Sequence, residues 1–303
     1  MDGRWPTMLP EHAALTTEIE REWDAVGLEG SLVARNLRTG AELGFGAGRA
    51  WPLASVVKLP LALVLHDAFA REELDPAEPF ELAPSRTTSG PSGVALFRHP
   101  SRVAAEDLTQ LALAVSDNAA TDVLLDRLGL EAVSRRIGAL GFPEIVVRHP
   151  MRALYGTDDA VTTAGLALTA GGATPGGGHV IPELDPARAN AGTARALVDL
   201  LHRVWTDDVS TPEACARLRE ALGHQPTRHR LAIELASDDV CVRSKTGTFL
   251  DLRHEVGVVE VGSGAEPVAV AAMTRSRIPA AVQLEADLAI GHAARLAVEA
   301  LLG

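Results

Sequence analysis

The sequence predicts an α/β protein of the α+β sandwich type, in which an antiparallel sheet of about five strands is flanked by helices from both ends of the chain. Three observations predict this arrangement: a pair of strand-like runs near the N-terminus, three more near the C-terminus, and a long stretch of helical periodicity between them. With 303 residues, at about 150 per domain, the chain can form one large domain or two. Because strands from both ends can complete one sheet, we expect the helical middle to be an inserted domain.

The N-terminal part of the chain predicts a helix, a hairpin and a second helix. Apolar residues recur at helical spacing over residues 11–26. Two strand-like runs around a polar turn, Ser31–Arg35 and Ala41–Phe45, predict a β-hairpin. A second, apolar helix is expected over residues 55–70, with Pro60 in its early turns, where a missing N–H costs least.

The rest of the chain divides into a helical middle and a β-rich end. Residues 57–210 predict an all-helical region, interrupted by an exposed Gly- and Pro-rich loop over residues 171–190. Residues 1–56 together with 211–303 are then expected to form the sandwich domain, and residues 57–210 the inserted helical domain. The C-terminal elements expected are a helix near 211–222, strands Asp239–Ser244, Glu255–Val261 and Pro267–Thr274, and a helix over Ala280–Leu302.

Composition and charge exclude several classes of protein. The 28 basic and 40 acidic residues give a net charge of −12, which repels polyphosphate and anionic lipid, so neither a nucleic-acid nor a membrane partner is expected. The two cysteines, Cys215 and Cys241, are too few for a disulfide framework and wrongly spaced for a zinc knuckle. We expect both to be buried thiols, and we expect no metal or other cofactor.

The N-terminus has no basic segment followed by the apolar stretch of a secretory signal. As written, the chain is therefore expected in the cytoplasm, and it would be secreted only if an export signal had been removed. We expect a monomer whose partner is a small molecule.

The scarcity of lysine singles out two residues. Of the 28 basic residues, only Lys58 and Lys245 are lysine, and the others are arginine. Arginine is effectively never deprotonated, whereas the amine of lysine loses its proton when it is buried or close to another cation. Chemistry that needs a titratable amine must therefore use one of these two residues.

Both lysines lie in short motifs. Ser55-Val-Val-Lys58, Ser116-Asp-Asn118 and Lys245-Thr-Gly247 follow one another in this order. Each motif is weak alone, because a Ser at a helix start is most often an N-cap and Thr-Gly a strand-end turn. Together they match the signature of class A β-lactamases and penicillin-binding proteins, and the chain resembles this superfamily of serine hydrolases from the hairpin to the last helix. The resemblance implies a β-lactamase-like fold with the active site in the cleft between the two domains.

The spacing and the resemblance together suggest roles for the catalytic residues. Lys58 lies three residues after Ser55 on one helix face, so its amine can act as base for the Ser55 nucleophile. The helix dipole and Lys245 both lower the pKa of Lys58. Ser116 would bridge the two lysines and pass the proton to the leaving nitrogen.

Substrate binding is expected from residues around the same motifs. The backbone N–H groups of Ser55 and Thr248 would form the oxyanion hole. The Asn118 amide would bind the substrate's side-chain amide. The resemblance implies that Thr246, Thr248 and Arg253 bind a substrate carboxylate, next to Gly247 of the third motif.

One region departs from the family. Class A β-lactamases carry a glutamate and an asparagine in an Ω loop, where they position the deacylating water, whereas residues 147–161 contain neither. This loop is expected to be short, with Arg148 and Thr162-Thr163 at its ends. The residues that could replace the glutamate are Asp158, Asp159, His149 and Tyr155, and Lys58 could itself serve in both half-reactions.

The sequence therefore predicts a β-lactamase-like serine hydrolase that forms an acyl-enzyme on Ser55, hydrolyses β-lactam amides with slow deacylation, and contributes to antibiotic resistance. The enzyme alternative is a D-Ala-D-Ala peptidase-like, esterase or acyl-transfer activity on a cytosolic metabolite. The non-enzyme alternative is a β-lactam-binding or sensing protein that holds a stable acyl adduct.

Overall fold

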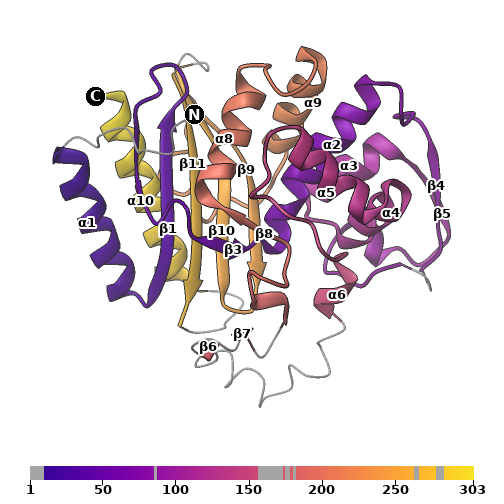
Figure 1. Cartoon of the computed structure of the whole chain (residues 1–303), viewed down its shortest axis with the longest axis horizontal. Coiled ribbons are helices and arrows are strands. Elements are labelled where there is room, and N and C mark those ends of the chain that lie inside the picture. Colours follow the sequence, from indigo (N-terminus) through magenta and orange to yellow (C-terminus); the bar gives the residue numbers. More distant parts are fainter. Residues whose placement is uncertain are drawn as a thin grey trace.

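The computed structural model describes residues 10–84, 87–155, 173–174, 178–179, 182–262, 266–277 and 283–303. Its centre is a five-stranded sheet in the order β2-β1-β11-β10-β9, with every neighbouring pair antiparallel (Figure 1). The predicted antiparallel sheet of about five strands is confirmed. Its strands are β1 (Leu28–Asn36), β2 (Glu42–Phe45), β9 (Val240–Phe249), β10 (Leu252–Val261) and β11 (Glu266–Ser276).

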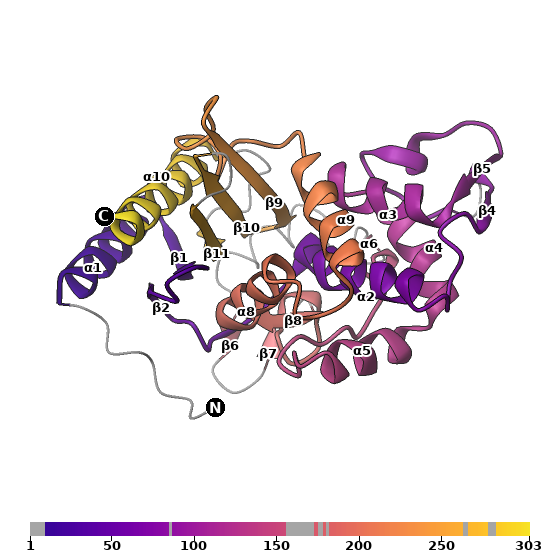
Figure 2. The same cartoon turned by 90° about the horizontal axis from the view of Figure 1, so that it is seen from above.

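Helices cover both faces of the sheet, which explains why its central strands are apolar on both sides. Helices α1 (Pro10–Ala25) and α10 (Leu284–Leu302) pack together on one face, as Figure 2 shows. Helix α8 (Ala194–Trp205) packs on β1, β10 and β11. The alternation along β1 follows from this, because Leu32 joins the core under α1 and α10 while Val33 joins the core on the opposite face. Helix α8 thus packs on the sheet although it falls within the range 57–210.

The helical region surrounds α2 (Lys58–Ala70), in which the first eleven residues are all buried. Helix α2 contacts α3, α5 and α9, and this packing fixes the position of the helix. A helix buried on all sides needs apolar residues all round, and the sequence from Leu59 to Leu65 supplies them. The helices of this region are α3 (Ala105–Ala114), α4 (Asn118–Leu128), α5 (Leu130–Ala139), α6 (Arg152–Tyr155) and α9 (Pro212–Gly223).

The range 57–210 is not all-helical as predicted. Strands β4 (Pro79–Leu82) and β5 (Ser101–Ala104) form a hairpin, and β8 (Ala191–Thr193) pairs with β3 (Ala50–Pro52). These runs are too short for periodicity to separate them from loops. The short pair β6 (Ala173–Thr174) and β7 (Gly178–His179) and the 3₁₀ turns η1 (Ala54–Val57), η3 (Gly93–Leu96) and η4 (Pro182–Leu184) complete the described elements.

Two further expectations have clear outcomes. Cys215 is a buried thiol, but Cys241 is exposed and both are free, so the prediction of two buried thiols is wrong for Cys241. Cys241 lies near the start of β9, where the edge strand faces outward. Among the described helices, none combines the length and apolar character that crossing a membrane requires.

Candidate active site

Ser55 and Lys58 meet because the helix begins with a 3₁₀ turn. Ser55 lies in η1, and α2 begins at Lys58 rather than at Ser55 as predicted. In a 3₁₀ turn the side chains at i and i+3 eclipse one another. Lys58 Nζ accordingly lies 3.2 Å from Ser55 Oγ. Ala54 enters this turn with a φ of 46°, a left-handed conformation that non-glycine residues adopt at a cost and that recurs at functional sites.

Ser116 reaches the same amine from the turn between α3 and α4. Its φ of 56° places it in the left-handed region. The Asp117 carboxylate holds this turn, because it caps α4 by accepting from the amides of Ala119 and Ala120 and also accepts from the Val94 amide at 2.6 Å. The Ser116 carbonyl oxygen and Oγ lie 2.6 Å and 3.1 Å from Lys58 Nζ.

Lys58 is the centre of the site. Its side chain is fully buried, and its fourth contact is Asn118 Oδ1 at 2.6 Å. Burial lowers the pKa of Lys58 well below 10.5, and the positive charge of Lys245 lowers it further, while Asp117 and Asp122 oppose this shift. The structure therefore brings Ser55, Lys58, Ser116 and Asn118 together.

Strand β9 passes directly against η1 at Gly247. A Cβ atom at this position would lie 2.9 Å from the Leu53 carbonyl oxygen and 2.9 Å from Val56 Cγ2, so only glycine allows this approach. Lys245, two residues earlier, is fully buried and donates to the Thr246 carbonyl oxygen at 2.9 Å. The hydrogen bonds of the described residues do not include the expected one between Ser116 and Lys245.

Burial also lowers the pKa of Lys245, to about 7, with Arg230 lowering it further and Glu255 raising it. Glu255 lies on β10 and is fully buried. Its Oε1 accepts from Ser244 Oγ at 2.6 Å and from Gln225 Nε2 at 3.2 Å, while its Oε2 accepts from the Leu231 amide. A buried carboxylate held in this way supplies the negative charge that Lys245 needs nearby when it is protonated.

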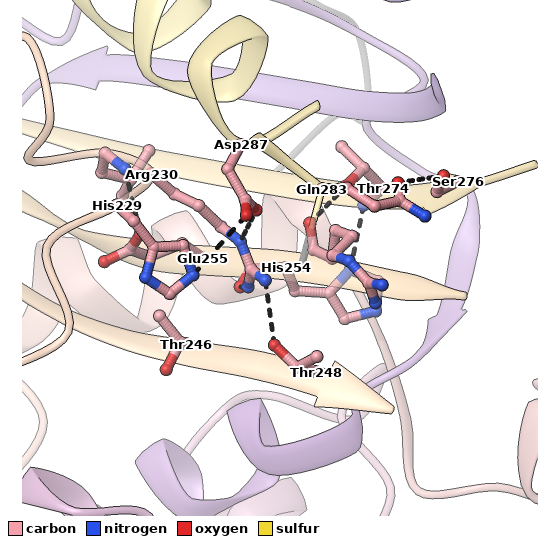
Figure 3. A network of polar contacts seen from close by, with 12 residues as sticks. His229, Arg230, Thr246, Thr248, His254, Glu255, Thr274, Ser276, Gln283 and Asp287 are labelled. Carbon is pink, nitrogen blue, oxygen red and sulfur yellow. Dashed lines mark hydrogen bonds and ion pairs between the residues drawn. The ribbon is translucent and has the colours of Figure 1, made fainter. Parts of the chain in front are cut away.

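Thr246 and Thr248 have partners that the sequence analysis missed. The Thr246 amide and hydroxyl donate to Gln225 Oε1 at 2.9 Å and 3.0 Å. Thr248 Oγ1 accepts from Arg230 Nη2 at 3.0 Å, and Arg230 Nε donates to Asp287 Oδ1 at 2.7 Å (Figure 3). Arg230 has a side chain only 1% exposed, so a buried polar network stands behind β9.

Arg253 lies beside Thr248, its partner in the register of β9 and β10. It is fully buried, and its Nη1 donates to the carbonyl oxygens of Leu250 and Leu252 at 2.8 Å each. Its Nε and Nη2 atoms are buried with no hydrogen-bond partner among the described residues. One end of the guanidinium, Nη1, therefore binds the backbone of the β9–β10 turn.

The start of the loop at Arg148 is hydrogen-bonded to Asn190. The backbone amides of Arg148 and His149 donate to Asn190 Oδ1 at 2.7 Å and 3.0 Å, and the Asn190 carbonyl oxygen accepts from the Leu53 amide beside η1. Asn190 therefore joins the start of this loop to the turn that precedes η1. The expected end, Thr162-Thr163, lies outside the described residues.

At the end of the loop predicted over residues 171–190, Ala187 and Arg188 are exposed, whereas Ala189 and Asn190 are buried. Asn190 is only 3% exposed, and Leu184 packs in one cluster with Ala54 and Leu252. Polar loop sequences of this kind usually stay in water, but here the closing asparagine satisfies backbone amides that would otherwise lack partners.

Of the residues considered as replacements for the Ω-loop glutamate, His149 is engaged at both ring nitrogens. Its Nδ1 lies 3.0 Å from the Pro150 carbonyl oxygen, and its Nε2 accepts from the Asn190 amide at 3.2 Å. Asp158 and Asp159 lie outside the described residues, as does the side chain of Tyr155. The segment between Arg148 and Asn190 also contains Glu183, a carboxylate that the sequence analysis did not consider. Its Oε2 atom is buried without a hydrogen-bond partner among the described residues.

The chain is similar to known proteins over nearly its whole length. The model of the β-lactamase enzyme family matches residues 14–301. The β-lactamase regulatory protein BlaB of Streptomyces cacaoi is 45% identical over 288 residues, which cover 89% of this chain and 91% of that protein.

Solved structures share the fold at low sequence identity. A β-lactamase from Sphaerobacter thermophilus has a TM-score of 0.75 at 21% identity and covers 96% of each chain. PBP-A has a TM-score of 0.77 at 20% identity and covers 99% of each chain. A mutant of PBP-A, solved as an acyl-enzyme complex with penicillin G, has a TM-score of 0.77 at 19% identity over 96% of this chain and 97% of that chain.

Proposed function

Because the chain belongs to the β-lactamase enzyme family, we propose that Ser55 forms a covalent acyl adduct with a β-lactam and releases it slowly enough for the protein to act as a β-lactam sensor. The observation that carries this proposal is the contact set of Lys58. Its buried amine touches the nucleophile Ser55 Oγ and three oxygens from a different motif.

Counting donors shows why this amine suits a base. A neutral amine has two N–H bonds and one lone pair. The Ser116 carbonyl oxygen and Asn118 Oδ1 can only accept, so they take the two N–H bonds at 2.6 Å each. The lone pair is then left for the hydroxyl groups of Ser55 and Ser116. The lowered pKa of Lys58 favours this neutral form.

The adduct forms in two balanced steps. Ser55 Oγ attacks the lactam carbonyl carbon while its proton passes to Lys58 Nζ, and the carbonyl oxygen becomes an oxyanion. We assign the backbone amides of Ser55 and Thr248 to this oxyanion, because β9 passes beside η1 at Gly247. The ring C–N bond then breaks, and the proton moves from Lys58 through the Ser116 hydroxyl to the leaving nitrogen. The adduct has the mass of the protein plus the whole ligand.

Release of the acyl group needs a water that a general base activates. The described part of the loop between Arg148 and Asn190 offers few groups for this role. His149 has no ring nitrogen free for a water, and the described part of the loop offers Glu183 alone as a buried carboxylate without a partner. General-base assistance contributes typically 10²–10⁴-fold, so an acyl group without it persists. A relative named a regulatory protein supports the same assignment. Hydrolytic turnover of β-lactams, or of another amide or ester, is the second candidate.

An intact-mass time course with excess chromogenic cephalosporin tests the proposal, with colour followed in parallel. We expect one burst of colour, a lasting mass increase, and neither signal with Ser55→Ala. Sustained colour without a lasting adduct would establish turnover in place of sensing. The absence of both signals in the unmodified protein would contradict acylation by this ligand class.

A further inference from the structure

The peptide bond between Pro52 and Leu53 is held at both ends by residues that are distant in the chain. The Pro52 carbonyl oxygen lies 2.8 Å from Nε2 of His254 on β10, and the Leu53 amide donates to the Asn190 carbonyl oxygen at 2.7 Å. A peptide bond is planar, so fixing its C=O and its N–H fixes the plane of the bond. The direction in which the chain enters the turn of Ser55 is therefore set from outside that turn.

The neighbours of the His254 ring settle which of its nitrogens carries the proton. A backbone N–H only donates, so Nδ1, which lies 2.9 Å from the Thr274 amide nitrogen, is an acceptor without a proton (Figure 3). In the neutral ring Nε2 then carries the proton and donates it to the Pro52 carbonyl oxygen. Burial lowers the pKa of His254 to about 3, which keeps the ring neutral at physiological pH. Both nitrogens of this fully buried ring are thus satisfied by backbone groups.

The turn that follows this peptide bond contains a strained residue. Ala54 has a φ of 46°, a conformation that disfavours any residue with a Cβ atom. Strain of this kind persists only where the surrounding structure over-determines it. If Ala54 relaxed to a negative φ, the chain after it would take another direction, and Ser55 Oγ would leave its place 3.2 Å from Lys58 Nζ.

We infer that His254 is a positioning residue for the nucleophile: by holding the Pro52 carbonyl oxygen, it keeps Ala54 in the left-handed conformation that presents Ser55 to Lys58. His254 acts through the backbone, because its ring bonds the backbone of Pro52 on one side and of β11 on the other. It lies outside the three motifs that the sequence revealed. The inference rests on the proposed function, because adduct formation is the step that the position of Ser55 serves.

Two substitutions of His254 separate its two contacts. The amide nitrogen in His254→Gln lies as far along the side chain as Nε2 and can still donate to the Pro52 carbonyl oxygen. The side chain in His254→Asn is one carbon shorter, so it can accept from the Thr274 amide but does not reach Pro52. Adduct formation with the chromogenic cephalosporin, followed by intact mass, should slow by about 10²-fold in His254→Asn, the scale for a misplaced reacting group, and be largely retained in His254→Gln. Equal rates in the two folded variants would overturn the inference.

Ala54→Gly provides a readout that a purely structural role of His254 would not move. Glycine adopts a positive φ about as readily as a negative one, so the turn then depends less on the hold on Pro52. Ala54→Gly should therefore raise the rate of the His254→Asn variant about tenfold and change that of the unmodified protein much less, because two residues that act on one turn are not additive. Equal factors in the two backgrounds would overturn the inference.

Amide hydrogen exchange, measured by NMR, tests the hold on this peptide bond without a ligand. In the unmodified protein the Leu53 amide should exchange as slowly as the amides of β10 and β11, because the bond is released only when the sheet opens. Exchange as fast as that of exposed loop amides would overturn the inference, even if His254→Asn did not fold.

The outcomes separate this inference from the proposed function. An adduct on Ser55 that forms equally fast in the unmodified protein and in folded His254→Asn overturns the inference and leaves the function in place. Slow exchange of the Leu53 amide that becomes faster in His254→Asn than in His254→Gln, without any adduct in the unmodified protein, supports the hold on the turn and contradicts the function.

Discussion

Side chains from η1, α2 and the α3–α4 turn meet at Lys58, and β9 lies beside η1 at Gly247, whereas the loop between Arg148 and Asn190 is held by hydrogen bonds between its two ends. The first region has the proposed nucleophile, Ser55, the proposed base, Lys58, and a second buried lysine. The described part of the second has one carboxylate oxygen without a partner, that of Glu183. Under the proposed function, forming the acyl group and releasing it therefore depend on separate parts of this chain, so that one can be lost without the other.

Replacing Lys58 should have the largest effect, on the rate of adduct formation by the first region. Lys58→Met keeps the length of the side chain and removes the amine, so adduct formation should slow by about 10³-fold, within the range of general-base effects. Stopped-flow kinetics with the chromogenic cephalosporin measures it. Because the variant also leaves the Ser116 carbonyl oxygen and Asn118 Oδ1 without this donor, its melting temperature is measured alongside to separate loss of folding from loss of the base. Unchanged kinetics would show that Lys58 is not the base.

Gly247→Ala tests how much the close approach of β9 to η1 contributes to adduct formation. The added methyl group would lie 2.9 Å from the Leu53 carbonyl oxygen and must push β9 away from η1. Adduct formation should slow by about 10²-fold, as for loss of one oxyanion-hole donor. Gly138→Ala on α5 is the control, since no atom lies within 4 Å of its added carbon. An equal loss of rate in both variants would mean that the effect is not local.

Glu183→Gln probes the loop. If Glu183 activates the water for the slow release of the acyl group, its neutral isostere should slow release about tenfold or more and leave adduct formation unchanged. Decay of the adduct mass after removal of free ligand measures release. Asp185→Asn, in the same loop with its carboxylate on the Ala187 amide, is the control. Equal release rates in Glu183→Gln and the unmodified protein would mean that water acts without this residue.

The smallest effect concerns stability and depends on two buried histidines, His66 in α2 and His254 in β10. Burial lowers the pKa of His66 to about 4 and that of His254 to about 3. The unfolded chain binds these protons near pH 6.5 and the folded chain does not, so stability is full above pH 6.5 and is lost as the pH falls toward 4. Each group contributes at most about 1.4 kcal/mol per pH unit.

Asp251, whose pKa burial raises to about 6, acts in the opposite direction and offsets part of this loss. Urea unfolding at pH 7 and pH 5 checks the balance, and His66→Gln should reduce the difference between the two. Greater stability at pH 5 than at pH 7 would contradict it.

The sequence predicted those parts of the site whose residues lie close together along the chain. Ser55 and Lys58 are three residues apart, and a three-residue spacing fixes their geometry in any helical turn. The five-stranded sheet followed from runs that alternate or are wholly apolar. The sheet residues beside the site were predictable for the same reason.

The parts that the sequence did not reveal are contacts between distant segments. Asn190 meets His149 across 41 residues, and Arg230 meets Asp287 across 57. Periodicity describes one element at a time and contains no information on such pairs. The burial of Arg253 depends on the shape of the β9–β10 turn, which the sequence pattern leaves open.

The protonation state of Lys58 tests the central claim most directly, and a chain with two lysines allows it to be read without ambiguity. Protein labelled with ¹³C and ¹⁵N in lysine gives two side-chain NMR signals, and Lys58→Met assigns them. The account predicts that Lys245 titrates near pH 7 and that the Lys58 signal is that of a neutral amine at a pH well below 10.5. Two signals that both titrate near pH 10.5 would contradict it, because Ser55 would then have no base.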